Sequence, residues 1–216
     1  MAPLQFGILM IPYQVLDVAL PTDILSSCST DYFAILSKVN HPDAHLAPGA
    51  IDIEFHHINS TLSPVLLTSN TRSLPSTTLT TCPPLDYLLI GGPDLTTFTL
   101  SPEFSAFIKA HVDAGKGLFC TCTGALAIAS SGVLDGRRAT VNHEALEMAA
   151  QIRPQVKWER KRWVVDGNVW TSGGACAGGD MMAEWVVGKY GKEVAQVGFR
   201  GLDFEPRDVE GKRVVL

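Results

Sequence analysis

The sequence lacks the features that mark membrane, secreted and nucleic-acid-binding proteins. It contains no apolar stretch near the roughly 18 residues that cross a bilayer. The N-terminus "MAPLQFGILMIPY" has neither a basic segment nor a small-residue cleavage site. Only 18% of the 216 residues are charged, and a formal net charge of −5 provides no positive field for nucleic acid or an anionic membrane surface. We therefore expect a cytoplasmic protein without membrane or nucleic-acid partners.

Cysteines are also few, and their number is odd. Five cysteines in an ordinary-sized chain do not make a disulfide framework and fit a reducing compartment. The spacing Cys120-x-Cys122 has no second pair or histidine-rich partner, so we predict no metal site. The glycine-rich stretch "SGGACAGGD" (172–180) matches neither the dinucleotide fingerprint nor the P-loop. We expect no cofactor.

What the sequence does contain is an alternation of short apolar runs with helix-like segments. Runs that are apolar at nearly every position suit strands covered on both faces, and their alternation with helices predicts a mostly parallel sheet with helices on both sides. The expected strands are 4–11, 31–38, 86–92, 116–121 and 167–172, and the expected helices are 101–115, 123–136, 142–152 and 179–191.

We expect one domain over residues 1–216. Residues 41–84 are rich in Ser, Thr and Pro and predict an irregular excursion around a strand or hairpin at "IDIEFHHI". The basic run 157–163 is typical of the exposed side of a hairpin. "EVAQVGF" (193–199) is interpreted as a late strand, followed by a C-terminal extension at about 200–216.

The junction after the fourth expected strand carries the main chemical signal. "KGLFCT" passes without a loop into a helix through Cys122, Thr123 and Gly124, so the chain must turn sharply at Cys122. A thiol there would lie near free N–H groups at a helix start, which favour the thiolate. Cys120, inside the strand, would instead be buried and inert. From this spacing alone, Cys122 is either a nucleophile or a small buried residue.

The order of several motifs along the chain resembles the DJ-1/ThiJ/PfpI superfamily, which shares the class I glutamine amidotransferase-like fold. These are "ILMIPYQVLDVALP", "DYLLIGGPD", "CTGALAIASSGVLDGRRAT" and "VDGNVWTSGGACAGGD", and the resemblance covers roughly residues 4–191. The Cys-Thr-Gly elbow is most similar to the branch that contains the isocyanide hydratases and the amidase-like domains of some transcription regulators. The resemblance implies a flavodoxin-like, doubly wound α/β/α sandwich with Cys122 as catalytic nucleophile.

The same resemblance implies partners for Cys122. Asp17 takes the place of the acid that faces the sulfur, as a protonated carboxyl that donates to sulfur or as a group that passes a proton to substrate. His143 takes the place of a histidine that acts as base or ion-pairs with the thiolate. The alternative is that Asn142 caps the helix and His143 is merely exposed.

Other residues are implied to form the substrate pocket. Backbone N–H groups at Gly91, Gly92 and Thr123 are candidates for an oxyanion site, although a glycine pair ending a strand is also an ordinary turn. Cys176 is interpreted as a thiol lining the pocket or simply a small residue. Thr123 stands where the protease-like branch has a histidine, which argues against peptidase activity.

Three functions are compatible with these residues. The first is a cofactor-independent, isocyanide hydratase-like enzyme in which Cys122 adds to a small electrophile and Asp17 transfers the proton. The second is a Cys122-His143 dyad that hydrolyses an acyl group or forms carbon-carbon bonds in Michael or aldol-type reactions of secondary metabolism. The third is a redox-sensing or chaperone-like protein with an oxidisable Cys122.

The C-terminal segment is short and not basic, so a transcription regulator with a following DNA-binding domain is not expected. The resemblance implies a homodimer with a small-molecule substrate.

Overall fold

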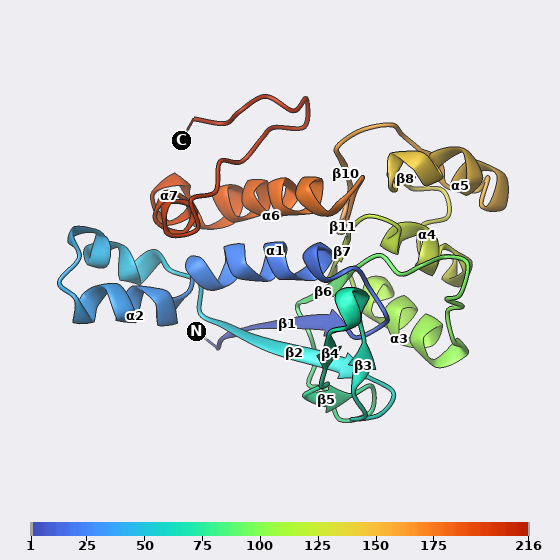
Figure 1. Cartoon of the computed structure of the whole chain (residues 1–216), viewed down its shortest axis with the longest axis horizontal. Coiled ribbons are helices and arrows are strands. Elements are labelled where there is room, and N and C mark those ends of the chain that lie inside the picture. The colour runs from blue at the N-terminus through green and yellow to red at the C-terminus, as the bar shows by residue number, and fades with distance from the viewer. Residues whose placement is uncertain (1, 216) are drawn as a thin grey trace.

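The computed structural model describes residues 2–215 and shows a central sheet between layers of helices (Figure 1). The order of the main sheet is β10-β11-β7-β6-β1-β2-β5. All pairings are parallel except that of β10 with β11. These strands are β1 (Leu4–Leu9), β2 (Ile53–Asn59), β5 (Thr77–Thr78), β6 (Tyr87–Ile90), β7 (Gly117–Cys120), β10 (Trp163–Asp166) and β11 (Val169–Ser172). The predicted flavodoxin-like α/β/α fold is confirmed.

Helices cover both faces because the chain adds strands in opposite directions on the two sides of β1. The path from β1 to β2 runs one way along the sheet and the paths from β6 to β7 and β11 run the other, so right-handed crossovers place their helices on opposite faces. Helices α1, α6 and α7 pack on one another (Figure 1). The helices are α1 (Val15–Ser27), α2 (Thr30–Lys38), α3 (Pro102–Asp113), α4 (Gly124–Ile128), α5 (Leu146–Ile152), α6 (Ala175–Tyr190) and α7 (Lys192–Gly201).

Two of the expected strands are wrong, because the segments are helices. Residues 31–38 lie in α2, where the Ser29 side chain caps the helix by accepting from the Tyr32 N–H, and only Phe33 and Leu36 are buried. The segment 193–199 lies in α7, whose buried residues face α1 and α6. In both, apolar side chains three and four residues apart form one buried stripe, which is a helical spacing.

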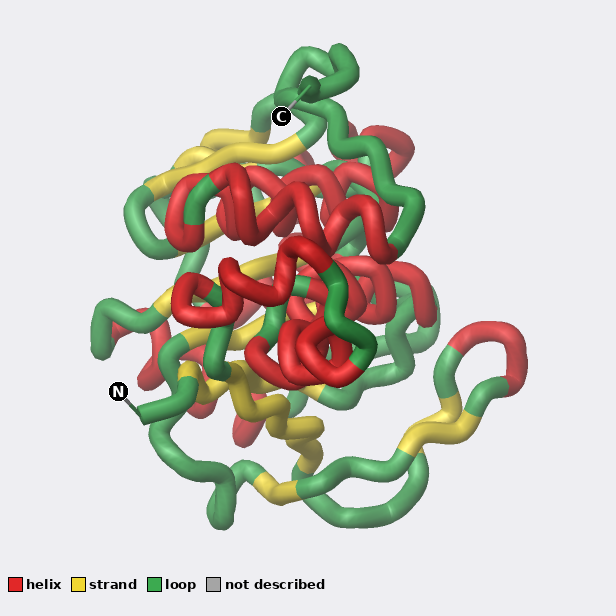
Figure 2. The backbone as a smooth tube through the Cα atoms, turned by 90° about the vertical axis from the view of Figure 1, so that its left-hand side faces the viewer, coloured by secondary structure: helices red, strands yellow, loops and turns green. Residues whose placement is uncertain are grey.

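Residues 41–84 contain more structure than the predicted excursion. The strand at "IDIEFHHI" is present as β2, and the edge strand β5 follows later. Between them, β3 (Val65–Leu66) and β4 (Arg72–Ser73) form a small antiparallel hairpin, the arm visible at the lower right of Figure 2. The arm is tied to the start of α1, since the Val15 N–H donates to Thr68 Oγ1 at 3.0 Å.

The basic run 157–163 does not form one side of a hairpin as expected. Its first part is β9 (Lys157–Trp158), which pairs in parallel with β8 (Arg138–Ala139). Trp163 then begins the antiparallel hairpin of β10 and β11. The run therefore links two separate sheets.

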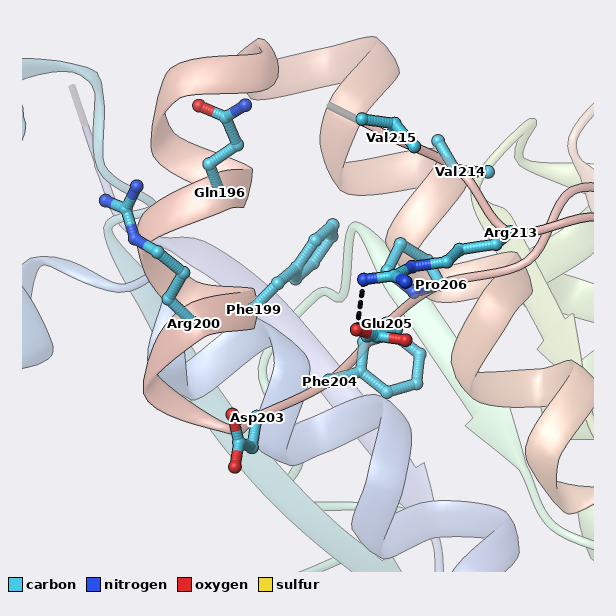
Figure 3. Close-up of a pocket in the computed structure, with 10 residues that line it drawn as sticks. All are labelled: Gln196, Phe199, Arg200, Asp203, Phe204, Glu205, Pro206, Arg213, Val214 and Val215. Carbon is cyan, nitrogen blue, oxygen red and sulfur yellow. Dashed lines mark hydrogen bonds and ion pairs between the residues drawn. The ribbon is translucent and has the colours of Figure 1, made fainter.

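The C-terminal segment after α7 folds back along the helices. Arg207 and Arg213 form an isolated bridge in this segment, and Arg213 pairs with Glu205 (Figure 3). A cavity of about 340 Å³ lies between the segment and α7. Across residues 2–215, no helix combines the length and apolar character needed to cross a membrane.

Candidate active site

The sharp turn predicted at Cys122 is present. Strand β7 ends at Cys120, α4 begins at Gly124, and Cys122 adopts a left-handed φ of 56°. A side chain at that φ is strained and persists only where its surroundings hold it. Gly124 allows α4 to begin against β6, because a Cβ there would lie 2.6 Å from the Ile90 carbonyl oxygen.

The Cys122 sulfur lies at the carboxyl edge of the sheet, with the side chain only 8% exposed. Asn142 donates to it from Nδ2 at 3.4 Å, and the Thr123 N–H is a second donor. The Asn142 N–H also donates to the Cys122 carbonyl at 3.1 Å. Sequence reasoning considered Asn142 only as a helix cap and missed its contact with sulfur.

Asp17 is brought to the same place from the first turn of α1, and its side chain is fully buried. Its Oδ2 accepts from the Gly92 N–H at 2.8 Å, whereas Oδ1 has no hydrogen-bond partner among residues 2–215. Burial raises the pKa of Asp17 to about 6, and the Gly92 bond only partly opposes this. The carboxyl can therefore gain or lose a proton near neutral pH.

The charges around the sulfur oppose thiolate formation in the resting site. Burial and then the negative charge of Asp17 raise the pKa of Cys122. The hydrogen bonds from Asn142 and Thr123 act in the other direction because they favour the thiolate. The resting pair at neutral pH is a thiol beside a carboxylate, although no hydrogen bond joins the two side chains in the described part of the chain.

Gly91 and Gly92 end β6 in close contact with this group. A Cβ on Gly92 would lie 2.6 Å from the Thr123 nitrogen and 3.0 Å from Asp17 Oδ2. The Gly92 N–H, a candidate oxyanion donor, is directed to Asp17 here, while the Thr123 hydroxyl donates to the Pro93 carbonyl at 2.7 Å. The Thr123 N–H is the predicted donor that faces the sulfur.

His143 directs its ring away from this hydrogen-bond network. Its Nε2 lies 2.9 Å from the Lys161 carbonyl oxygen and packs against Gly173. No hydrogen bond between His143 and Cys122 occurs within residues 2–215. The expected cap is present, since the Asn142 side chain accepts from the Glu144 N–H at 3.0 Å.

The other two cysteines near this edge differ in their surroundings. Cys120 is fully buried in β7, and burial raises its pKa strongly. Cys176 is exposed in the first turn of α6, which begins inside the stretch expected to be a turn. No group of three or more His, Cys, Asp or Glu residues in the described chain could hold a metal.

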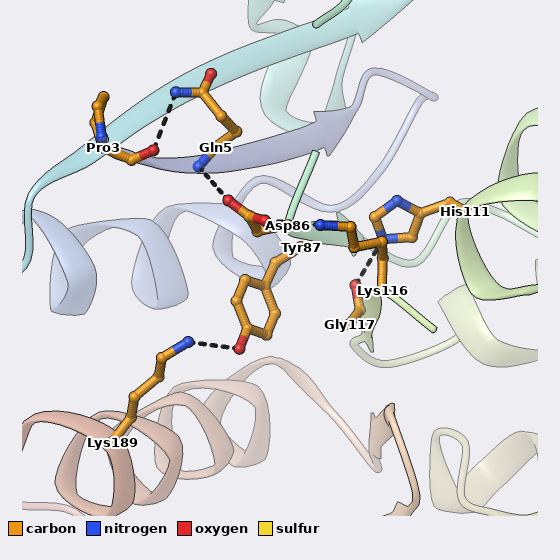
Figure 4. A network of polar contacts seen from close by, with 8 residues as sticks. All are labelled: Pro3, Gln5, Asp86, Tyr87, His111, Lys116, Gly117 and Lys189. Carbon is orange, nitrogen blue, oxygen red and sulfur yellow. Dashed lines mark hydrogen bonds and ion pairs between the residues drawn. The ribbon is translucent and has the colours of Figure 1, made fainter. Parts of the chain in front are cut away.

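The opposite end of the sheet holds a separate polar network. Lys116 pairs with Asp86 at 2.9 Å, and Lys189 donates to the Tyr87 hydroxyl at 2.7 Å (Figure 4). These residues line a cavity of about 710 Å³ at the amino-terminal edge of the strands. In open α/β sheets ligands bind at the carboxyl edge, where Asp17, Gly92 and Cys122 meet.

Comparison with known proteins shows the family of the chain. The family model described as "DJ-1/PfpI family" matches residues 41–187. The chain belongs to the DJ-1/PfpI family. It is 27% identical over 208 residues to the isonitrile hydratase of Pseudomonas putida, covering 94% of this chain and 79% of that protein.

Regulators and solved structures extend the comparison. The HTH-type transcriptional regulator GbdR of Pseudomonas aeruginosa is 29% identical over 113 residues, which are 52% of this chain and 31% of the regulator. A THiJ/PfpI family protein from Pseudomonas syringae superposes with a TM-score of 0.76 at 22% identity, covering 96% of this chain and 78% of that one. Drosophila melanogaster DJ-1beta gives 0.71 at 18%, covering 94% and 99%. Both structures share the fold.

Proposed function

We propose that this protein is a cofactor-independent enzyme that hydrates a small isocyanide to an N-substituted formamide, with Cys122 as nucleophile and Asp17 as the proton-transfer group. The observation that carries the proposal is the buried Asp17 carboxyl beside the strained Cys122, with Oδ1 unpartnered among the described residues. The isonitrile hydratase of Pseudomonas putida, similar over most of the chain, supports the substrate class.

In the first step the Cys122 sulfur attacks the terminal carbon of the isocyanide. The S–H bond breaks, its proton moves to the Asp17 carboxylate, and an S–C bond forms. Asp17 then delivers the proton to the same carbon, which leaves a thioimidate, R–N=CH–S–Cys122. A pKa of about 6 suits a group that must accept and release a proton near neutral pH.

In the second step water adds to the thioimidate carbon. One water proton passes through Asp17 to nitrogen, and the C–S bond breaks. The second water proton leaves the hydroxyl as the formyl C=O forms, and the departing thiolate takes it up. The product is R–NH–CHO, so one isocyanide and one water are consumed. Asn142 and the Thr123 N–H stabilise the departing thiolate because both donate to sulfur.

The other two functions have less support. A Cys-His dyad needs His143 within reach of the sulfur, and its ring is bound to the Lys161 carbonyl. A redox role needs a thiolate that oxidises readily, whereas burial and Asp17 raise the pKa of Cys122. We also propose that the protein acts as a homodimer, on the family resemblance alone.

The proposal is tested by incubating the protein with a simple alkyl isocyanide and measuring formamide. We expect turnover by the wild type, none by Cys122→Ala, and a loss of at least about a hundredfold in Asp17→Asn, the usual scale for removing a general acid-base group. Asp17→Asn should still react with iodoacetamide at Cys122. Full turnover by Asp17→Asn would contradict the role of Asp17.

A further inference from the structure

Two adjacent side chains near Cys122 have different partners. Asn142 directs Nδ2 to the sulfur at 3.4 Å. His143, the next residue, directs Nε2 to the Lys161 carbonyl oxygen at 2.9 Å. The residue that resembles a catalytic histidine thus has a structural partner, and its neighbour contacts the reacting atom.

We propose that Asn142 is the side-chain donor that stabilises the Cys122 thiolate, and that His143 is a positioning residue that holds Asn142 in place. The proposal rests on the proposed function only in taking Cys122 as the nucleophile. It requires no particular substrate.

The orientation of the Asn142 amide is fixed by contacts at both ends. Oδ1 accepts from the Glu144 N–H at 3.0 Å, so only the NH₂ end can point to the sulfur. The Asn142 backbone N–H donates to the Cys122 carbonyl at 3.1 Å. Together with the bond from Nδ2 to the sulfur, this contact joins the 142–144 turn directly to the strained residue.

The turn is also held by apolar packing. Val141 and Ala145, on either side of it, are buried with Leu126 and Ala129, which follow the elbow along the chain. The buried residues of this small cluster are distinct from the main core, and the half-buried Trp158 packs against both. This apolar packing holds only the inner side of the turn. The outer side, where His143 lies, is held by polar contacts.

The His143 ring supplies those contacts. Nε2 carries the hydrogen that the Lys161 carbonyl accepts, and Arg160 donates to the His143 carbonyl at 3.3 Å. A Cβ on Gly173 would lie 2.8 Å from Nε2, so this glycine leaves the space that the ring occupies. With Nε2 committed in this way, His143 anchors the turn to the 160–162 segment.

The electrostatic balance shows why a neutral donor matters here. Asp17, reaching the site from α1, disfavours the thiolate, and Asn142 and Thr123 oppose it by hydrogen bonding. Charged residues near the turn include Glu144, in the turn itself, and Arg160, which contacts the His143 carbonyl. Lys161, whose carbonyl accepts from His143, pairs through Nζ with Glu159 at 3.3 Å. Removing the Asn142 donor leaves the effects of burial and Asp17 less opposed, so the pKa of Cys122 should rise.

The first test measures the rate of iodoacetamide alkylation of Cys122 against pH. Asn142→Ala removes both the sulfur donor and the cap, whereas Asn142→Ser keeps a capping oxygen but is too short to reach the sulfur. We expect both variants to shift the alkylation profile to higher pH and to react about tenfold more slowly at pH 7, the effect of about one pKa unit. Unshifted profiles in both variants would overturn the role of Asn142.

The second test separates positioning from acid-base chemistry at His143. His143→Gln keeps a donor for the Lys161 carbonyl but cannot act as a base, whereas His143→Ala removes both. We expect His143→Ala to shift the profile as Asn142→Ala does, and His143→Gln to retain most of the wild-type profile. If His143→Gln is as impaired as His143→Ala, with Asn142→Ala unaffected, His143 is the base and the proposal is wrong.

A double variant tests whether the two residues act through one contact. If His143 acts only by holding Asn142, Asn142→Ala with His143→Ala should be no slower than Asn142→Ala alone; independent roles would give the product of the two losses. Urea unfolding of each variant confirms that it is folded. Alkylation uses no isocyanide, so absence of hydration would overturn the proposed function and leave this result intact.

Discussion

Asp17 is expected to make stability depend on pH. Its pKa is about 6 in the folded protein against 3.8 when exposed, so ionisation of this group destabilises the folded state. Its favourable contribution is complete below about pH 4 and is lost as the pH rises through 6. This difference between the exposed and folded pKa values corresponds to about 3 kcal/mol.

The measurement is the difference in free energy of unfolding between Asp17→Asn and the wild type from pH 4 to pH 7. As the pH rises across this range, we expect the free energy of unfolding of Asp17→Asn to increase relative to that of the wild type by up to about 3 kcal/mol. Carboxyls with lowered pKa values, Asp86 and Glu159 among them, are present in both proteins and cancel. A difference that stays constant with pH would show that folding does not raise the pKa of Asp17.

Cys122, Asp17 and Gly92 could be predicted as neighbours because each follows a strand, and parallel strands bring their carboxyl ends to one edge. The direction of a side chain is harder to predict. The motif placed His143 near the sulfur, but a one-residue step in a turn directs its ring to Lys161 and leaves Asn142 facing Cys122. The sequence signal for this contact was Asn142 itself, because a capping asparagine uses its amide oxygen and leaves its NH₂ group free to donate.

Among the helices and strands, the errors came from treating short apolar runs as strands. Charged residues at 192, 193 and 200, on the side away from the buried ones, indicate a helix in α7. In α2 the overlooked signal was the capping Ser29. The runs that were predicted correctly, such as β7, are apolar at consecutive positions because helices cover both faces of the sheet.

Two glycines in different elements should respond oppositely to alanine. At Gly92 a Cβ would meet the Thr123 backbone nitrogen at 2.6 Å, and backbone cannot move cheaply. We expect Gly92→Ala to destabilise the protein by about 2 kcal/mol and to impair turnover. Urea unfolding measures the first effect and formamide production the second.

Gly188 is the matched control. It lies inside α6, and a Cβ there would meet nothing within 4 Å. Gly188→Ala should stabilise the protein by about 0.5 to 1 kcal/mol through helix propensity and leave turnover unchanged. Equal effects of the two substitutions would contradict the close packing described at Gly92.

At the scale of the whole molecule, the C-terminal segment packs along the helices, and Asp180 in α6 binds this segment. This buried carboxylate pairs with Arg162 and accepts from the Arg207 N–H at 2.8 Å. It thereby joins α6 to the segment before β10 and to the C-terminal segment. Removing one partner of a buried ion pair leaves the charge of the other without a counter-ion. We therefore expect Asp180→Ala to lower the free energy of unfolding by about 3 kcal/mol.

The exposed pair Glu205–Arg213 is the control for this prediction. Both side chains are more than 60% exposed, at 61% and 64%. Glu205→Gln should therefore change the free energy of unfolding by less than about 1 kcal/mol. If Asp180→Ala is equally mild, the C-terminal segment does not depend on Asp180.

The single most informative measurement is the intact mass of the wild-type protein quenched during turnover of an alkyl isocyanide, followed by peptide mapping. We expect a fraction of the protein to carry the full mass of one isocyanide, located on the peptide that contains Cys122. Formamide production with the added mass on another cysteine, such as the exposed Cys176, would contradict Cys122 as the nucleophile.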